Sequence, residues 1–73
     1  MASSLKSMLG AQVREIRRSR GLTQESLAEQ LDVTPRYLAG VERGERNLTL
    51  DSIDALAKQL GVDARSLLGI EEA

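Results

Sequence analysis

Residues 22–44 read LTQESLAEQLDVTPRYLAGVERG and carry the clearest structural signal in the chain. It contains one short pattern twice, as LTQESL at 22–27 and as VTPRYL at 33–38. In each copy an aliphatic residue precedes a Thr, and a second aliphatic residue follows that Thr after three intervening positions. A Thr hydroxyl can accept a hydrogen bond from a free N–H of the first helical turn, while the two aliphatic residues pack together. The pattern therefore predicts two helices capped by Thr23 and Thr34.

The connection between these two helices is very short, because only Asp32 and Val33 separate the first helix from the next cap. So short a link makes a corner between crossed helices rather than an antiparallel return. The apolar residues that would fill the inside of this corner are Leu27, Ala28, Leu31, Val33, Leu38 and Val41. The stretch therefore predicts a helix-turn-helix, with Asp32 at a turn position where Asp tolerates left-handed backbone.

The same start pattern recurs outside this stretch, as LTLDSI at 48–53 and as VDARSL at 62–67. Gly21, Gly44 and Gly61 each follow a helical pattern, where a glycine commonly ends a helix. Leu9, Val13 and Ile16 fall on one face of a further helix over about residues 5–20. We expect an all-α fold: a compact five-helix bundle in one domain over residues 1–73, with residues 1–8 as a candidate flexible N-terminal arm.

The composition excludes several classes of function. The 73 residues include no Cys and no His, so a disulfide framework, the usual zinc ligands and the usual general base are all missing. We therefore expect no enzyme, no metal site and no cofactor. The apolar runs are too short to span a membrane, and the first ten residues have no apolar signal region. A cytoplasmic location is the default expectation.

The charge is unevenly distributed along the chain. A net charge of −1 and an isoelectric point near 5.3 argue against a purely electrostatic nucleic-acid binder. Residues 1–46, however, carry eight Lys and Arg against six Asp and Glu, whereas residues 47–73 carry two against five. The positive charge therefore accompanies the helix-turn-helix, and the acidic part of the chain lies elsewhere.

The chain resembles, over roughly residues 9–68, the XRE family, the Cro and phage-repressor (lambda-repressor-like) type of helix-turn-helix domain. Its most specific parts are L-T-Q-E-x-L-A at 22–28, V-E-R-G at 41–44 and a run similar to L-x-x-I-A-x-A-L-G-V at 50–62. Within the family, RYLAGVERGERNLTL at 36–50 is most similar to restriction–modification controller proteins, small dimers that time expression of an endonuclease. The chain departs from the family at Asp32, where Gly is usual.

The resemblance implies that the third helix enters the major groove of double-stranded DNA with its N-terminal residues at the base edges. The implied base contacts are Thr34, Pro35, Arg36 and Tyr37. Arg36 can reach guanine O6 and N7 together, although it could also be a plain surface charge. Tyr37 could contact a thymine methyl group, stack on Arg36, bind a phosphate, or simply close the edge of the core.

The resemblance also implies contacts to the DNA backbone, which set position and affinity rather than sequence. The implied phosphate contacts are Thr23, Gln24, Arg43, Arg46 and Asn47. Both Thr residues are also explained as helix caps, and the loop cations could be merely solvated. Gly40, inside the third helix, either lets the DNA backbone approach or relieves helix packing, and packing is the safer interpretation. The resemblance further implies a structural ion pair between Arg17 and Glu42.

The C-terminal end is more apolar than a minimal domain requires. A two-fold dimer on a pseudo-palindrome roughly doubles the contacts of one half-site, so we predict a homodimer built on this end. The predicted interface residues are Val62, Leu67, Leu68 and Ile70, which could alternatively close the core. The leading hypothesis is thus a dimeric, sequence-specific transcriptional regulator. The alternative is an antitoxin or adaptor that acts mainly through a protein partner, such as a toxin; RNA polymerase is a further candidate partner.

Overall fold

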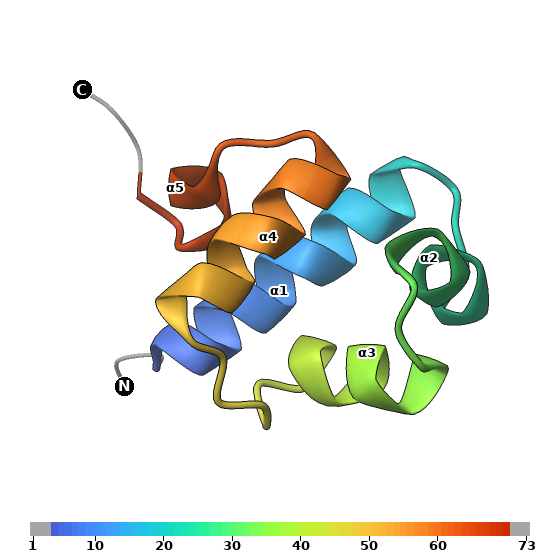
Figure 1. The fold of residues 1–73 in the computed structure, drawn as a ribbon, viewed down its shortest axis with the longest axis horizontal. Helices are drawn as coiled ribbons and strands as arrows, with labels where there is room; N and C mark the ends of the chain where they lie inside the picture. Colours follow the sequence, from blue (N-terminus) through green and yellow to red (C-terminus); the bar gives the residue numbers. More distant parts are fainter. Residues whose placement is uncertain (1–3, 71–73) are drawn as a thin grey trace.

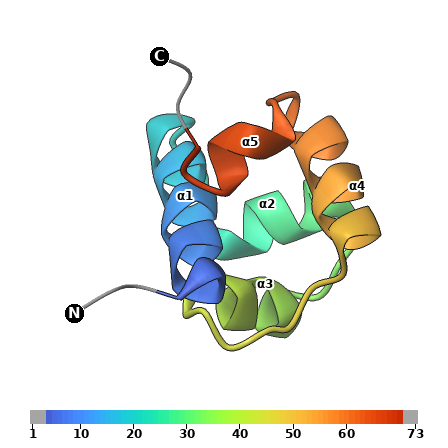
Figure 2. The same ribbon diagram turned by 90° about the vertical axis from the view of Figure 1, so that its left-hand side faces the viewer.

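The computed structural model describes residues 4–70, and these form the helices α1 (Leu5–Ser19), α2 (Gln24–Leu31), α3 (Pro35–Glu42), α4 (Leu50–Leu60) and α5 (Ala64–Leu67). No strand is present within this range. Figure 2 shows α1 and α4 on opposite sides of the bundle, with α5 across one end and α3 across the other. The all-α, five-helix fold expected from the sequence is confirmed.

The caps predicted from the repeated pattern are all present. The side chains of Thr23, Thr34, Thr49 and Asp63 each accept a hydrogen bond from a backbone N–H of the helix that follows. The three glycines predicted to end helices all have positive φ angles, between 68° and 76°. Local capping chemistry therefore sets the bounds of these helices.

The first helix begins earlier than a flexible arm over residues 1–8 would allow. Ser4 caps α1 by accepting a hydrogen bond from the N–H of Ser7 at 3.1 Å. Residues 5–8 therefore belong to α1, and residues 1–3 lie outside the described residues.

The helix-turn-helix has the predicted corner between α2 and α3 (Figure 1). Asp32 lies in the left-handed region with φ of 58°, and it is the one non-glycine residue with positive φ among the described residues. Asp adopts this conformation more readily than most residues, which explains why the turn forms without glycine. All six residues predicted to fill the corner lie in the core or pack against it.

The core is aliphatic and draws on every helix. Its most completely buried side chains are Leu27, Leu38, Leu67 and Val13. The helices α1 and α3 approach closely at Gly10, where an added methyl group would press on the carbonyl oxygen of Val41 and lie 2.6 Å from that of Glu42. The missing side chain of Gly10 therefore lets α1 lie directly against the end of α3 and fixes where α3 sits.

Candidate nucleic-acid interface

The first turn of α3 is held rigidly and points outward. The Thr34 hydroxyl oxygen accepts a hydrogen bond from the Tyr37 N–H at 3.0 Å, and Pro35 occupies the first helical position, where no N–H is needed. Arg36 follows as an exposed residue, and Tyr37 is half buried. The cap and the proline therefore aim the Arg36 side chain into solvent from a fixed base.

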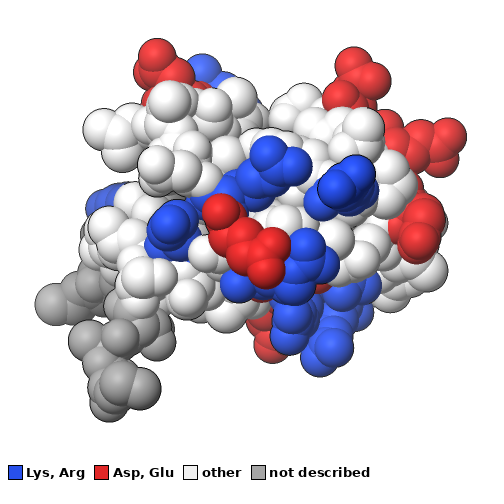
Figure 3. Space-filling view, turned by 90° about the horizontal axis from the view of Figure 1, so that it is seen from below, with Lys and Arg blue, Asp and Glu red and all other residues white. Residues whose placement is uncertain are grey.

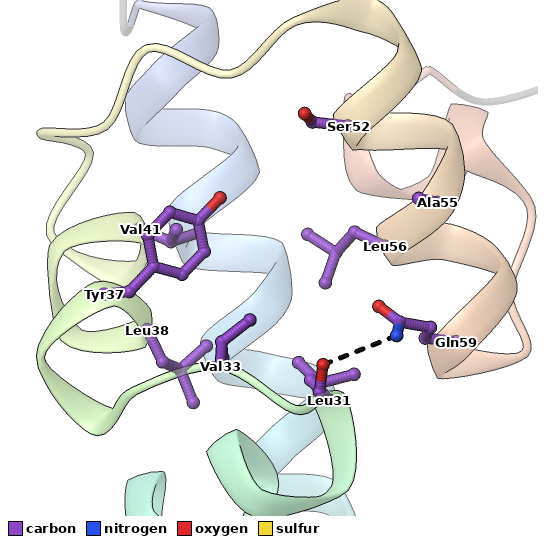
Figure 4. Close-up of a pocket in the computed structure, with 9 residues that line it drawn as sticks. All are labelled: Leu31, Val33, Tyr37, Leu38, Val41, Ser52, Ala55, Leu56 and Gln59. Atoms are coloured by element: carbon purple, nitrogen blue, oxygen red, sulfur yellow. Dashed lines mark hydrogen bonds between the residues drawn. The ribbon is translucent and has the colours of Figure 1, made fainter.

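The Tyr37 side chain makes two kinds of contact. Its ring packs against the core edge and, together with Leu56 of α4, lines an apolar pocket between α3 and α4 (Figure 4). Its other contact is the guanidinium of Arg46, whose central carbon lies 5.0 Å from the ring centroid. This is a cation–π distance. The ring therefore stacks with Arg46 of the following loop, and the predicted alternative of stacking with Arg36 is wrong.

The loop between α3 and α4 carries the remaining candidate cations. Arg43 donates to the Glu45 carboxylate at 3.0 Å, and more than half of each side chain is exposed. The hydrogen bond to Glu45 raises the pKa of Arg43, which stays cationic. Because an exposed ion pair of this kind contributes little to stability, a phosphate group could replace Glu45 as the partner. Arg46 and Asn47 are also exposed and lie on the same loop.

Behind α3 lies a buried polar cluster centred on Glu42. Its side chain is 0% exposed and receives hydrogen bonds from Arg17 Nε at 2.7 Å and Arg17 Nη2 at 3.0 Å. Gln24 Nε2 also donates to this carboxylate at 3.1 Å, and Arg14 lies 3.8 Å away. Arg17 and Glu42 thus form the structural ion pair that the resemblance implied, and they join α1 to the end of α3.

The same cluster controls the ionisation of Glu42. Burial alone would raise the pKa of this carboxyl group, but the hydrogen bonds from Arg17 and Gln24 bring the net pKa below its ordinary value of 4.5. Glu42 is therefore a carboxylate at neutral pH. Gln24, which the resemblance assigned to a phosphate, is half buried and already uses its amide nitrogen on Glu42.

The third helix α3 and the loop after it, which carry most of the candidate DNA contacts, lie together at one edge of the bundle (Figure 1). Figure 3 looks at the fold from below Figure 1, and so at α3 and the loop that follows it. Basic side chains gather across the middle of this face with acidic atoms among them, and further acidic side chains lie at its upper and right margins. A face of this kind suits a polyanion despite the net charge of −1 on the whole chain.

The residues predicted for a dimer interface do not form a common exposed surface. Leu67 is 0% exposed and belongs to the core, while Val62 and Leu68 are half buried against it. Only Ile70 of this set is exposed, at 54%. The assignment of Leu67 to an interface is therefore wrong, because packing under α1 and α4 already uses its whole surface.

A more exposed apolar patch lies beside these residues, and of its members only Leu68 was predicted from the sequence. Leu5 is 66% exposed and Leu50 is 80% exposed, and both line a shallow pocket together with Leu48 and Leu68. Leu50 is the first residue of α4 and directly follows the cap Thr49. We call these four residues the leucine patch.

The fold and the arrangement of its charges define a helix-turn-helix domain of the kind that binds double-stranded DNA through its second motif helix. The helix-turn-helix model HTH_3 matches residues 13–67, and the chain belongs to this family. The relatives include a control protein and the immunity repressor protein of Bacillus phage phi105. No helix within residues 4–70 is long and apolar enough to cross a membrane.

Several relatives are controller proteins. The chain is 39% identical to control protein C.BamHI of Bacillus amyloliquefaciens, over 93% of this chain and 85% of that protein. It is 40% identical to the restriction–modification controller protein C.AhdI of Aeromonas hydrophila, with a TM-score of 0.73 over 85% of this chain and 94% of that one. It is 34% identical to the controller protein C.Esp1396I, solved as a tetramer with its natural operator, with a TM-score of 0.75 over 93% and 90%.

Proposed function

We propose that this chain is a restriction–modification controller: a dimeric transcriptional regulator that places α3 in the major groove of a pseudo-palindromic operator. The observation that carries the proposal is the exposed Arg36 on the capped first turn of α3, followed by the exposed Arg43 and Arg46 of the next loop. The relatives named above favour this role over that of an antitoxin or adaptor. The role requires access to cellular DNA, in line with the cytoplasmic location expected from the sequence.

In this proposal some residues contact the bases and others contact the phosphates. Arg36 reads a guanine edge, for which a guanidinium offers two parallel donors. Thr34 and Pro35 hold the first turn at the base edges. Arg43 and Arg46 bind backbone phosphates, and neutralising phosphates makes binding depend steeply on salt.

Three further residues supply polar groups at the margins of the DNA face. Asn47, exposed at the end of the loop, can donate to a phosphate from its side-chain amide. Thr23 and Gln24 lie at the start of α2, and the backbone N–H groups of a helix start suit a phosphate. Because the side chains of Thr23 and Gln24 already bond Ser26 and Glu42, their proposed contribution is to hold that helix start in place.

We further infer that the two-fold interface lies at the leucine patch. One protomer on one half-site makes few contacts, and a dimer with two recognition helices one DNA turn apart doubles them. The patch combines the two most exposed large hydrophobic residues of the described chain, Leu50 and Leu5, with a shallow pocket that could receive the partner's side chains. It also lies beside the loop that carries Arg46 and Asn47, which line the same pocket.

Binding-site selection from random double-stranded DNA tests the proposed function. The expected product is an inverted repeat bound by two chains, with the mass of the complex measured by light scattering. Enrichment of no sequence, under salt conditions in which the protein stays folded, would refute the proposed role.

The interface is tested separately by Leu50→Glu, compared with Ile70→Glu as the matched control. Both residues are exposed, so both variants should fold. We expect Leu50→Glu to shift the protein to monomer in sedimentation and Ile70→Glu to leave the dimer intact. The reverse result would indicate that the C-terminal residues predicted from the sequence form the interface.

A further inference from the structure

Arg46 is held differently from the other cation of its loop. Arg43 pairs with Glu45, its neighbour two residues away, whereas Arg46 lies back across α3 with its guanidinium over the Tyr37 ring. On the way, its side chain passes directly over Gly40. The three atoms nearest to the place of a Gly40 side chain are Nε, Cγ and Cδ of Arg46, at 3.1, 3.3 and 3.7 Å.

These contacts argue against one of the two interpretations of Gly40. The nearest atoms to the missing side chain belong to a flexible arginine and not to another helix, so the helix-packing interpretation is wrong. Gly40 is nonetheless a buried residue inside an α-helix, where glycine is less favourable than alanine. A glycine at position 40 therefore needs an explanation, and the Arg46 side chain, which lies where a Gly40 side chain would be, supplies one.

The position of Gly40 on α3 determines which face of the helix the Arg46 side chain covers. Arg36 and Gly40 are four residues apart, so they lie one helical turn apart on the same face of α3. A side chain laid across Gly40 therefore lies on the face that Arg36 occupies. Arg46 belongs to the loop after α3, but its charged side chain lies on α3 itself.

We propose that Gly40 is a positioning residue for DNA binding: its missing side chain lets Arg46 cross α3 and rest on Tyr37, so that Arg46 becomes part of the DNA-reading face. The proposal deepens the proposed function and rests on it. Tyr37 then acts mainly as the platform for Arg46 and not as an independent base contact. Holding a long side chain in place before binding reduces the ordering that DNA binding must otherwise impose.

The variant Gly40→Ala tests this directly. The added methyl group meets only the Arg46 side chain among its nearest neighbours, and alanine favours a helix, so the variant should unfold at the same or a higher temperature than the wild type. We expect its affinity for the selected operator to fall about two- to fivefold, the equivalent of one exposed cation–π contact.

A double-variant comparison separates positioning from a direct clash with DNA. In an Arg46→Ala background, Gly40→Ala should have no further effect on affinity, because the residue it positions is gone. In an Arg43→Ala background, which leaves the Gly40 contact intact, it should still weaken binding by the same factor. An equal loss in both backgrounds would mean that the methyl group contacts DNA itself, and the proposal would be overturned.

A measurement without DNA keeps this test independent of the proposed function. Protons held over the face of an aromatic ring are shielded, so the Arg46 Nε–H signal in the nuclear magnetic resonance spectrum should lie upfield of that of Arg43. Tyr37→Phe, which keeps the ring, should preserve this shift, while Tyr37→Leu and Gly40→Ala should remove it. An Arg46 signal that is unshifted in the wild type would refute the positioning even if the protein binds its operator. A wild-type protein with the shift but no operator would instead refute the proposed function alone.

Discussion

The variant Arg17→Ala should destabilise this domain far more than loss of an ordinary surface charge. Arg17 supplies two of the hydrogen bonds to the Glu42 carboxylate, which is 0% exposed, and its Nη1 also donates to the Leu22 carbonyl oxygen at 3.0 Å. Removing it leaves a buried carboxylate whose remaining polar neighbours are Gln24 at 3.1 Å and the half-exposed Arg14 at 3.8 Å. Breaking a buried pair in this way typically costs 3–5 kcal/mol.

The expected loss is near the low end of that range, about 3 kcal/mol, because Gln24 and Arg14 still compensate part of the charge. The whole domain, at 73 residues, should have a free energy of unfolding of roughly 4–11 kcal/mol. Arg17→Ala should therefore remove a large fraction of it and lower the unfolding temperature by about 12–24 °C.

The assay is urea unfolding followed by far-ultraviolet circular dichroism at pH 7, at one fixed protein concentration because a dimer's stability depends on concentration. Arg43→Ala is the matched control, since its pair with Glu45 is exposed and the unfolding midpoint should not move. The double variant Arg17→Met with Glu42→Met should recover much of the loss, because apolar residues of similar size leave no buried charge. A loss below about 1 kcal/mol for Arg17→Ala would refute the reasoning, since exposed pairs behave that way.

Three further predictions concern the packing, the acid sensitivity and the capping of α3. Gly10→Ala should lose about 1–3 kcal/mol of stability in urea unfolding, because its methyl group would press on backbone oxygens that cannot move aside. The stability that ionised Glu42 contributes is full above its unfolded pKa near 4.5 and is lost as pH falls through its lower folded pKa, so thermal unfolding of Glu42→Gln should depend less steeply on pH below 4.5. Thr34→Ala should cost about 1 kcal/mol and weaken operator binding, while leaving the similarly capped α4 intact by hydrogen exchange.

The fold could be predicted from the sequence because the residues that begin and end its helices act on their immediate neighbours. The caps at Thr23, Thr34, Thr49 and Asp63 and the glycines after α1, α3 and α4 act within one helical turn, so the residue types alone predict them. Even the departure at Asp32 followed from the backbone preference of one residue. The corner of the helix-turn-helix then followed from the length of one connection.

The partners of the site residues could not be predicted, because they depend on contacts across the fold. Sequence spacing offered Arg36 as a neighbour of Tyr37, but the loop after α3 folds back and brings Arg46 instead. The sequence alone does not distinguish an apolar residue that contacts a partner from one that packs in the core. Leu67 was therefore assigned to an interface although it is buried. Gln24 could not be linked to Glu42 without knowing that α2 passes beside the end of α3.

The most direct test of the central claim compares the wild type with Arg36→Ala and Arg43→Ala. Each is measured on the selected operator and on operators with single base-pair changes, over a series of salt concentrations. We expect Arg36→Ala to lose about 1–3 kcal/mol on the true site and its discrimination at one base pair, with the other positions unaffected. Arg43→Ala should weaken all sequences alike and lower the salt slope by about one. If Arg36→Ala discriminated every base pair as the wild type does, α3 would not read the operator through this residue, and the account would be contradicted.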